Sequence, residues 1–493
     1  MIRALALGGL ALAGCAQLAG LDTTSGVGSG SGSQQAVDTL VIERMSVGAT
    51  MITAPLDLTG LTANYLVGDA AAPTRMAATS PAAGTWQAPL AAAAPVEFTL
   101  PDQPTPPAPI PRLYAFPTPT LKLLFAPLEH PSPTPAPPTP ANIALTVPLD
   151  APTAATDSFL IYTVGSWTSR GITAAELPVA GSTTIGPFTY DFQTSGSITG
   201  RPLERITSKD AYLVLRYTGS TLTGVSQAGA FDQTGTDTVM TSMMAPVTAA
   251  PGGDVAVNPT MIAQRYAALR PAVSGVVMNW SVSAAPGYKI ASNAGPLLAG
   301  APVATTDTSI SLSFANPFVG RGWNAVLTLG TAASRTYTPA GMTASIVLSA
   351  SMNHFLIPAA GDVADLPAGL PLTLMFNGAA LTTDGTEIPT PTSPVRITLT
   401  TDKPAATVYT LQLLDILPNA DNTALGLHVV YVAASDQPSF SLPPEAFKTG
   451  HMYTLRTFST VGGYPSIASG DLTDRALPLA QAFFDSAVIK VMP

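Results

Sequence analysis

Short apolar runs recur along most of this chain, and each is bounded within a few residues by Gly, Pro, Asn or Asp. The runs are rich in Val, Ile, Leu, Thr and aromatic residues, a composition that favours β-strands between turns. They lie at residues 39–42, 159–164, 211–217, 309–314, 345–348, 395–399, 408–414 and 428–432. Short strands at this spacing predict an all-β chain built of sandwich modules.

Helical patterns are confined to two places. The first is 258–269, where Pro259 stands in the first turn and Ile262, Tyr266 and Leu269 fall on one face. The second is 473–484, which Pro478 interrupts. Both patterns predict short connecting helices.

The N-terminal residues have the layout of an export signal. Arg3 precedes an uncharged run of Ala, Leu and Gly that is too short to span a bilayer as a helix. The run ends in Leu12-Ala13-Gly14-Cys15, which resembles the lipobox of bacterial lipoprotein signal peptides. The resemblance implies cleavage before Cys15 and a lipid on its sulfur, so that the mature protein is anchored to a membrane. Because Ala16 and not Asp follows, the resemblance implies the outer membrane, with the modules facing either the periplasm or the outside.

Proline-rich and Gly/Ser-rich seams divide the chain. Residues 23–35 form a flexible Gly/Ser linker, and Pro-rich segments at 101–111, 127–140 and 389–394 predict stiff connectors or long loops. The predicted organisation is a cleaved signal peptide at 1–14, a lipidated linker at 15–37, a sandwich-like module at 38–126, a connector at 127–140, a β module at 141–250, and sandwich modules at 251–390 and 391–493.

Composition narrows the classes of partner. Cys15 is the only cysteine, so a mature chain with this thiol lipidated has no disulfide and depends on burial for stability. Charged residues make up only 10% of the chain, the net charge is −9, and no Lys/Arg cluster occurs. These features argue against electrostatic capture of nucleic acid or anionic lipid. For a protein anchored in the cell envelope, the partner we expect is an envelope protein or a glycan.

A repeated phrase gives the strongest indication of the type of module. Phe447, Gly450 and Tyr453 are spaced three apart before an alternating apolar run. This resembles the Leu-x-Pro-Gly-x-x-Tyr corner of fibronectin type III and related immunoglobulin-like sandwiches, although Lys448-Thr449 replaces the usual x-Pro. The Gly permits a chain reversal, and the corner Tyr buries its ring while its hydroxyl bonds to nearby backbone.

An upstream copy has the same spacing at Leu366, Gly369 and Leu372, but Leu372 has no hydroxyl to make the corner bond. The two copies predict tandem immunoglobulin-like and fibronectin type III-like modules, with Pro-rich connectors and one or two short helices. Uncharged modules in tandem predict a rod that presents its surfaces.

Motifs for catalysis are absent from the sequence. It contains no Gly-x-Ser-x-Gly elbow, His-Glu-x-x-His zinc helix, Walker loop or Rossmann fingerprint. The four histidines, His130, His354, His428 and His451, lie far apart in the sequence. We therefore expect a protein without enzymatic activity and without a cofactor other than the lipid on Cys15.

Two sets of residues are candidates for binding. Trp167 with Arg170, and Arg321 with Trp323, are flanked by glycines, which suits loops that present a ligand-binding face. Packing between sheets is the competing interpretation and the commoner use of such tryptophans, and Trp280, on a predicted strand, is assigned to the core. Asp232 and Asp237 flank Gly235 and form a weak Ca²⁺ candidate, against which ordinary turn chemistry is the commoner use of such residues.

These observations predict a lipid-anchored cell-envelope protein with a structural, adhesive or ligand-binding role. The alternative class is an envelope hydrolase or carbohydrate-processing protein whose site assembles from dispersed carboxylates, His and Trp. A third is a subunit of a larger envelope complex.

Overall fold

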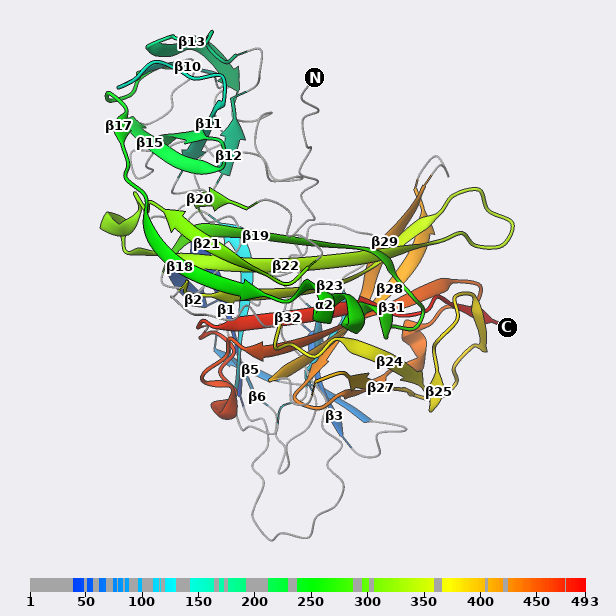
Figure 1. The fold of residues 1–493 in the computed structure, drawn as a ribbon. Helices are drawn as coiled ribbons and strands as arrows, with labels where there is room; N and C mark the ends of the chain where they lie inside the picture. Colours follow the sequence, from blue (N-terminus) through cyan, green and yellow to red (C-terminus); the bar gives the residue numbers. More distant parts are fainter. Residues whose placement is uncertain are drawn as a thin grey trace.

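The computed structural model describes residues 39–47, 51–55, 62–67, 74–77, 79–82, 85–87, 96–99, 110–114, 116, 120–129, 142–163, 168–172, 176–191, 212–228, 237–286, 295–300, 306–358, 366–403, 407–419, 424–474 and 476–493. These residues are predominantly β-strand, which confirms the predicted all-β class (Figure 1). Each of the eight predicted apolar runs overlaps a strand. The predicted leader, the Gly/Ser linker and Cys15 lie outside the described residues.

One continuous sheet passes through much of the molecule. Its strands pair in the order β19, β22, β23, β32, β31, β28, β29, β8, β7, β3, β4. Their bounds are Ser274–Pro286, Trp323–Tyr337, Ile346–Leu356, Leu479–Asp485, Met452–Gly462, Val408–Pro418, Leu425–Ser435, Arg112–Tyr114, Val96–Thr99, Thr62–Val67 and Thr74–Ala77. All neighbours are antiparallel except β29 and β8, which are parallel. Strand β28 is buried on both faces, as its nearly unbroken apolar run requires.

A second sheet packs on the C-terminal part of this one to form a sandwich. Its order is β25, β24, β27, β30, with bounds Ala379–Ala380, Pro371–Phe376, Val395–Thr401 and Ser439–Leu442. Apolar side chains of its inner face, among them Ile397 and Phe440, share one core with Leu411, Leu413 and Leu455 of the large sheet. Strands β26 (Thr386–Pro389) and β33 (Ile489–Met492) pair in parallel beside β31.

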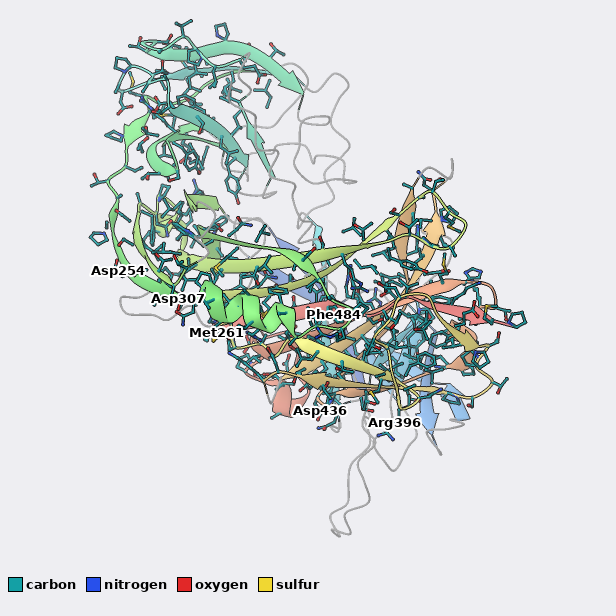
Figure 2. The ribbon with its side chains drawn as sticks, turned by 45° about the vertical axis from the view of Figure 1, so that its right-hand side comes forward. Asp254, Met261, Asp307, Arg396, Asp436 and Phe484 are labelled. Atoms are coloured by element: carbon teal, nitrogen blue, oxygen red, sulfur yellow. The ribbon has the colours of Figure 1, made fainter. Side chains whose placement is uncertain are left out.

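The helix α2 (Pro259–Ala267) and the strand pair β18–β21 (Ala250–Val257 and Thr308–Phe314) belong to the core on β19, β22, β23 and β32. Ile262 and Tyr266 of α2 are buried with Phe484 of β32 in this core. Figure 2 shows α2, which carries Met261, lying over the strands near Phe484. The helix predicted at 258–269 is therefore confirmed.

Two small sheets enclose a separate core at one end of the molecule (Figure 1). One sheet has the order β13, β10, β16, and the other joins β12, β11, β14, β15 and β17. Their bounds are Thr184–Asp191, Asn142–Pro148, Asp237–Met240, Thr168–Gly171, Asp157–Thr163, Tyr212–Thr218, Thr221–Ala228 and Ala245–Pro246. The opposite face of β11 and β14 contributes Tyr162 and Leu215 to the core that contains Trp323. Strand β20 (Gly295–Ala299) pairs with both β15 and β19 and so joins the two regions.

The first strands of the chain form a further sheet. It has the order β2, β1, β6, β5, with β9 parallel to β1, and the bounds are Met51–Pro55, Thr39–Val47, Thr85–Gln87, Thr79–Ala82 and Thr120–Glu129. In β9, the backbone of Lys122 bonds to that of Gly470 and Leu472, close to the end of the C-terminal region. Short 3₁₀ helices lie at Val319–Arg321 (η2), Pro444–Ala446 (η3) and Ile467–Ser469 (η4).

The second predicted helix, at 473–484, is wrong. Most of that segment's apolar part forms β32, which pairs with β23 on one side and β31 on the other. Its apolar residues, including Ala480, Ala482 and Phe484, are buried as an interior strand requires. An apolar run of this length is compatible with either a strand or a helix. Here it forms a strand because β23 and β31 pair with it on both sides.

Strand pairing crosses the predicted module boundaries. Strand β24 precedes the boundary at 390/391 and pairs with β27, which follows it. Strands β3, β4, β7 and β8 belong to the predicted first module, yet they extend the sheet of the last one through β29. The first and last predicted modules therefore lie side by side and do not stand at opposite ends of a rod. Of the predicted Pro-rich connectors, 389–394 is described as the link from β26 to β27.

Candidate functional site

A buried carboxylate lies among histidines in the C-terminal sandwich. Asp415 of β28 stands directly opposite His428 of β29 and opposite Tyr453 of β31. The pairing of β28 with β29 shifts register between Leu413 and Leu414, and this shift sets His428 opposite Asp415. Asp415, His428 and Tyr453 therefore lie in one row across three neighbouring strands.

His451 completes the group. Its Nδ1 lies 2.8 Å from Oδ2 of Asp415, and its side chain is 33% exposed while that of Asp415 is 3% exposed. The His451 ring also stacks on Tyr453, with ring centroids 6.1 Å apart. Among the described residues, Oδ1 of Asp415 has no hydrogen-bond partner.

The surroundings of Asp415 oppose its ionisation. Burial raises the pKa of this carboxyl, and the hydrogen bond from His451 together with the positive charges of His451, Lys448 and His428 offsets only part of that effect. Burial also raises the pKa of Tyr453 to about 12. The site therefore holds a proton more readily than an exposed Asp does.

The arrangement is one in which a carboxylate orients an imidazole. An Asp that accepts from Nδ1 fixes the ring and leaves Nε2 available, as in enzymes where the His acts as a base.

The predicted corner is present beside this group. The backbone N–H of Lys448 donates to the hydroxyl of Tyr453 at 2.9 Å, and the Tyr453 ring is fully buried. Phe447 packs edge-on against Tyr453, and Gly450 has φ of +84°, which only a glycine adopts readily. The sequence therefore identified the residues and the hydrogen bond of this turn correctly.

Replacement of Tyr453 by Phe is expected to remove only this hydrogen bond, because the two rings have the same shape. We expect the free energy of unfolding to fall by about 1 kcal/mol. Urea denaturation of both proteins measures the difference, and equal unfolding midpoints would contradict a stabilising role for the corner bond.

The upstream copy has a different geometry. Leu366 is buried and Leu372 packs against the core of α2, as apolar positions should. Gly369 has no positive φ; a side chain there would meet the carbonyl oxygen of Lys403 at 2.7 Å. Gly369 therefore does not share the left-handed conformation of Gly450, and this glycine permits a close approach of two chain segments.

The predicted aromatic binding face is not assembled around Trp323. Trp323 begins β22, is 1% exposed and stacks on Phe318. The candidate role of Trp323 in a binding face carried by loops is therefore wrong, and packing, the commoner use of a tryptophan, is what the structure shows. Gly322, in a left-handed conformation, ends η2 directly before this strand. Arg321, two residues before Trp323, is partly exposed and donates to Gln227 at 3.3 Å.

The remaining tryptophans and Arg170 do not form a described binding face with Trp323. Trp167 lies outside the described residues, and Arg170 is placed in β12 by its backbone. Trp280 is half-buried and packs against the same core cluster that contains Trp323, as its assignment to packing predicted.

The predicted Ca²⁺ candidate, Asp232 with Asp237, is only half described. Asp232 lies outside the described residues, and Asp237 opens β16. Within the part of the chain that the structure describes, no three His, Cys, Asp or Glu side chains gather as a metal site. Of the remaining histidines, His354 is buried in β23 and His130 falls outside the described ranges.

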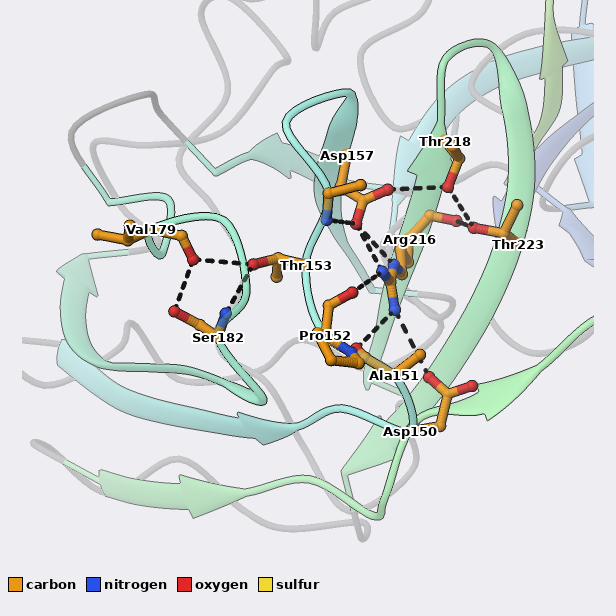
Figure 3. A network of polar contacts seen from close by, with 11 residues as sticks. Asp150, Ala151, Pro152, Thr153, Asp157, Val179, Ser182, Arg216, Thr218 and Thr223 are labelled. Atoms are coloured by element: carbon orange, nitrogen blue, oxygen red, sulfur yellow. Dashed lines mark hydrogen bonds and ion pairs between the residues drawn. The ribbon is translucent and has the colours of Figure 1, made fainter.

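Several buried charged side chains hold backbone segments in place. Four arginines pair with carboxylates at 2.6–3.0 Å: Arg216 with Asp157, Arg265 with Asp402, Arg335 with Asp384 and Arg456 with Asp485. The first three arginines also donate to pairs of backbone carbonyls. Figure 3 shows the network in which Arg216 binds Asp157 and the carbonyls of Ala151 and Pro152.

The Asp157 network predicts an acid-sensitive contribution to stability. Burial raises the pKa of Asp157, but hydrogen bonds from the Ala154 backbone, Arg216 and Thr218 outweigh burial and hold this pKa below its ordinary value. A lowered folded-state pKa stabilises the fold above the unfolded value of about 3.9, and the contribution is lost as pH falls through the folded-state pKa.

Asp157→Asn is therefore expected to lower the free energy of unfolding by about 1–2 kcal/mol at pH 7. The difference from wild type should shrink as the pH falls below about 3.9, the unfolded pKa, towards the lowered folded-state pKa of Asp157. Urea denaturation at pH 7 and pH 3 tests this, and a difference that is equal at both pH values would contradict it.

The sequence interpretation missed Asp415 and its pairing with His451. The available cue was the one charged residue inside the mainly apolar run at 408–417, since a buried carboxylate requires a partner. The identity of that partner depended on the pairing of β28 with β31.

Comparison of the sequence with models of protein families finds no match, and comparison with curated proteins finds none either. Over the described ranges, the structure contains no helix of the length and apolar character needed to span a membrane.

Proposed function

We propose that this chain is an exported lipoprotein, anchored in the outer membrane through Cys15, with a non-catalytic structural, adhesive or ligand-binding role in the cell envelope. The observation that carries the proposal is the N-terminal sequence, in which an apolar run ends in Leu12-Ala13-Gly14-Cys15. Several acyl chains on one cysteine hold a protein firmly, because each buried methylene adds about 0.8 kcal/mol.

The way in which the described strands and loops are held together supports a structural or binding role. Strands of several sheets are joined into one body, and the buried arginines bind carboxylates and backbone carbonyls that fasten loops. The Tyr453 corner supports likeness of the last module to fibronectin type III and immunoglobulin-like sandwiches. With charged residues at only 10%, a glycan or another weakly charged envelope protein is the partner that this chain suits.

Replacement of Cys15 by Ser tests the anchor. We expect the wild-type protein in the outer-membrane fraction of a bacterium with two membranes, and the Cys15→Ser protein in the soluble fraction, because no acyl chain can be attached. Ala16→Asp is the matched control: it keeps the cysteine, so the protein should stay membrane-bound and shift to the inner membrane. Membrane association of Cys15→Ser equal to wild type would contradict the anchor.

Protease digestion of intact cells then separates the possible roles. Loss of the protein, with a periplasmic control protein intact, would favour adhesion or extracellular binding. Protection until the envelope is broken would favour a periplasmic scaffold and would contradict an adhesive role.

A hydrolase is the second candidate, and the Asp415–His451 pair is the observation that favours it. An imidazole oriented in this way can serve as a general base. This candidate predicts that the purified protein hydrolyses a chromogenic ester and that His451→Gln abolishes the activity, while His428→Gln retains it. The non-catalytic proposal predicts no turnover above that of free imidazole in solution.

A further inference from the structure

A row of uncharged polar residues crosses one face of the large sheet. Successive strand pairs place four residues directly opposite one another: Asn279 of β19, Gly330 of β22, Asn353 of β23 and Gln481 of β32. Directly opposite residues project on the same side of a sheet, so the three amide side chains share one face. We call these four residues the amide row. Figure 1 shows β19, β22, β23 and β32 lying side by side.

We propose that the amide row is a binding site for a neutral glycan, whose hydroxyl groups it recognises by hydrogen bonds. This site rests on the proposed ligand-binding role of the chain and gives that role a surface and a class of ligand.

Gly330 leaves room for the amide of Asn353. A Cβ atom on Gly330 would lie 2.9 Å from Oδ1 of Asn353, so this amide oxygen lies close to the backbone of the neighbouring strand. Gly330 is inside β22 and has no positive φ, so its missing side chain provides space and not a special conformation. A glycine inside a strand often marks a place where a ligand approaches the backbone closely.

The amide row has hydrogen-bonding capacity that the fold does not use. The amide of Asn353, which is half-buried, donates to Oγ of Ser351 over a long 3.4 Å. Among the described residues, Oδ1 of Asn353 and the exposed side chain of Asn279 have no partner. A primary amide presents an acceptor and two donors side by side, which matches sugar hydroxyls, since each of them both donates and accepts.

The absence of charge in the amide row favours a neutral ligand. Further along β32 on the same face, Asp485 accepts two hydrogen bonds from Arg456, at 2.6 and 2.9 Å, so its charge is balanced. A charged ligand would leave its own charge without a counter-ion beside half-buried amides, which costs free energy. Peptides are usually recognised at a sheet edge or in an apolar groove, whereas this row is polar and lies across a sheet face.

The accessible part of the row lies over three strands. Neighbouring strands are about 4.8 Å apart, so Asn279 and Asn353 are separated by about 10 Å across β22. Gln481 is only 7% exposed and donates to Oγ1 of Thr460 at 3.4 Å, so it bounds the accessible part on the side of β31. The glycan therefore lies across β19, β22 and β23.

An array of neutral and acidic oligosaccharides, probed with the purified protein, tests the site. The neutral set contains chains of glucose, xylose and N-acetylglucosamine, and isothermal titration calorimetry then measures the affinity for each glycan that binds. We expect wild type to bind at least one neutral glycan. Asn353→Ala should weaken this binding about tenfold, because the ligand loses the hydrogen bonds of one amide. Gly330→Ala keeps that amide but displaces it, and should weaken binding about threefold.

Asn324→Ala is the matched control. Asn324 is also a half-buried asparagine of β22, and it lies about 20 Å along the strand from Gly330. Its replacement should leave the affinity unchanged. Urea denaturation of all three variants reports whether each is folded.

The proposal is overturned if wild type binds no neutral glycan, or if it binds acidic glycans alone. It is also overturned if Asn353→Ala and Gly330→Ala bind as wild type does, or if Asn324→Ala loses as much affinity as Asn353→Ala. Glycan binding that none of the variants weakens would leave the ligand-binding role standing and place it elsewhere on the chain. The anchor is tested separately with Cys15→Ser, so its failure is distinguishable from failure of this site.

Discussion

Trp323→Ala is expected to lower the free energy of unfolding by about 3–5 kcal/mol, the usual cost of truncating a buried large aromatic residue. Trp323 stacks on Phe318 with ring centroids 5.3 Å apart and meets Tyr162 edge-on at 6.5 Å. Tyr162 comes from β11, so the indole joins the small β region at one end of the molecule to the large sheet. The cavity left by the substitution opens at this junction.

Urea denaturation followed by circular dichroism measures the effect. Trp280→Ala is the matched control, because Trp280 is half-buried on the neighbouring strand and should cost clearly less. Equal losses from the two substitutions would contradict the assignment of Trp323 to the junction. A loss below about 1 kcal/mol for Trp323→Ala would place the ring in a surface position instead.

Asp402→Ala is expected to have an effect of similar size, about 3–5 kcal/mol, because it leaves a buried guanidinium without its carboxylate. Both carboxylate oxygens of Asp402 accept from Arg265 of α2, at 2.6 and 3.0 Å. Arg265 also donates to the carbonyls of Leu366 and Ala368, each at 2.6 Å. One arginine thus joins the helix to the segment before β24 and to the loop after β27.

The double variant separates the charge from the packing. Arg265→Met removes the charge and keeps an apolar chain, so Arg265→Met with Asp402→Ala should be more stable than Asp402→Ala alone. Equilibrium unfolding in urea gives all three values. If the free energy of unfolding of the single Asp402→Ala variant lies within about 1 kcal/mol of the wild-type value, the Arg265–Asp402 pair does not stabilise the fold as described.

The sequence predicted local features that depend on near neighbours. The strands, the helix at 258–269 and the Tyr453 corner follow from residues a few positions apart, and the structure contains all of them. The corner could be predicted because Gly450 and the Lys448 N–H lie within five residues of the tyrosine. These interactions need no knowledge of the rest of the chain.

Features that depend on distant pairing could not be predicted. Trp323 follows Gly320-Arg321-Gly322, a sequence that suggests a loop, but its ring packs on Tyr162 from another region. The segment at 473–484 becomes a strand because β23 and β31 flank it. The pairing of β8 with β29 joins residues more than 300 positions apart, and no periodicity in either segment encodes its partner.

The site follows the same rule. Asp415, His428 and His451 each appeared as an isolated residue, and only the register of β28 with its two neighbours brings them together. A buried carboxylate in an apolar strand was the one local sign that a partner was needed.

The most direct test of the account is mass spectrometry of the N-terminal peptide of the protein isolated from cell membranes. We expect a mature chain that begins at Cys15, with a mass increased by a diacylglyceryl group and an amide-linked acyl chain, as resemblance to bacterial lipoproteins implies. An N-terminus at Met1, or cleavage that leaves Cys15 with an unmodified thiol, would contradict lipid anchoring and with it the proposed place of the protein in the cell envelope.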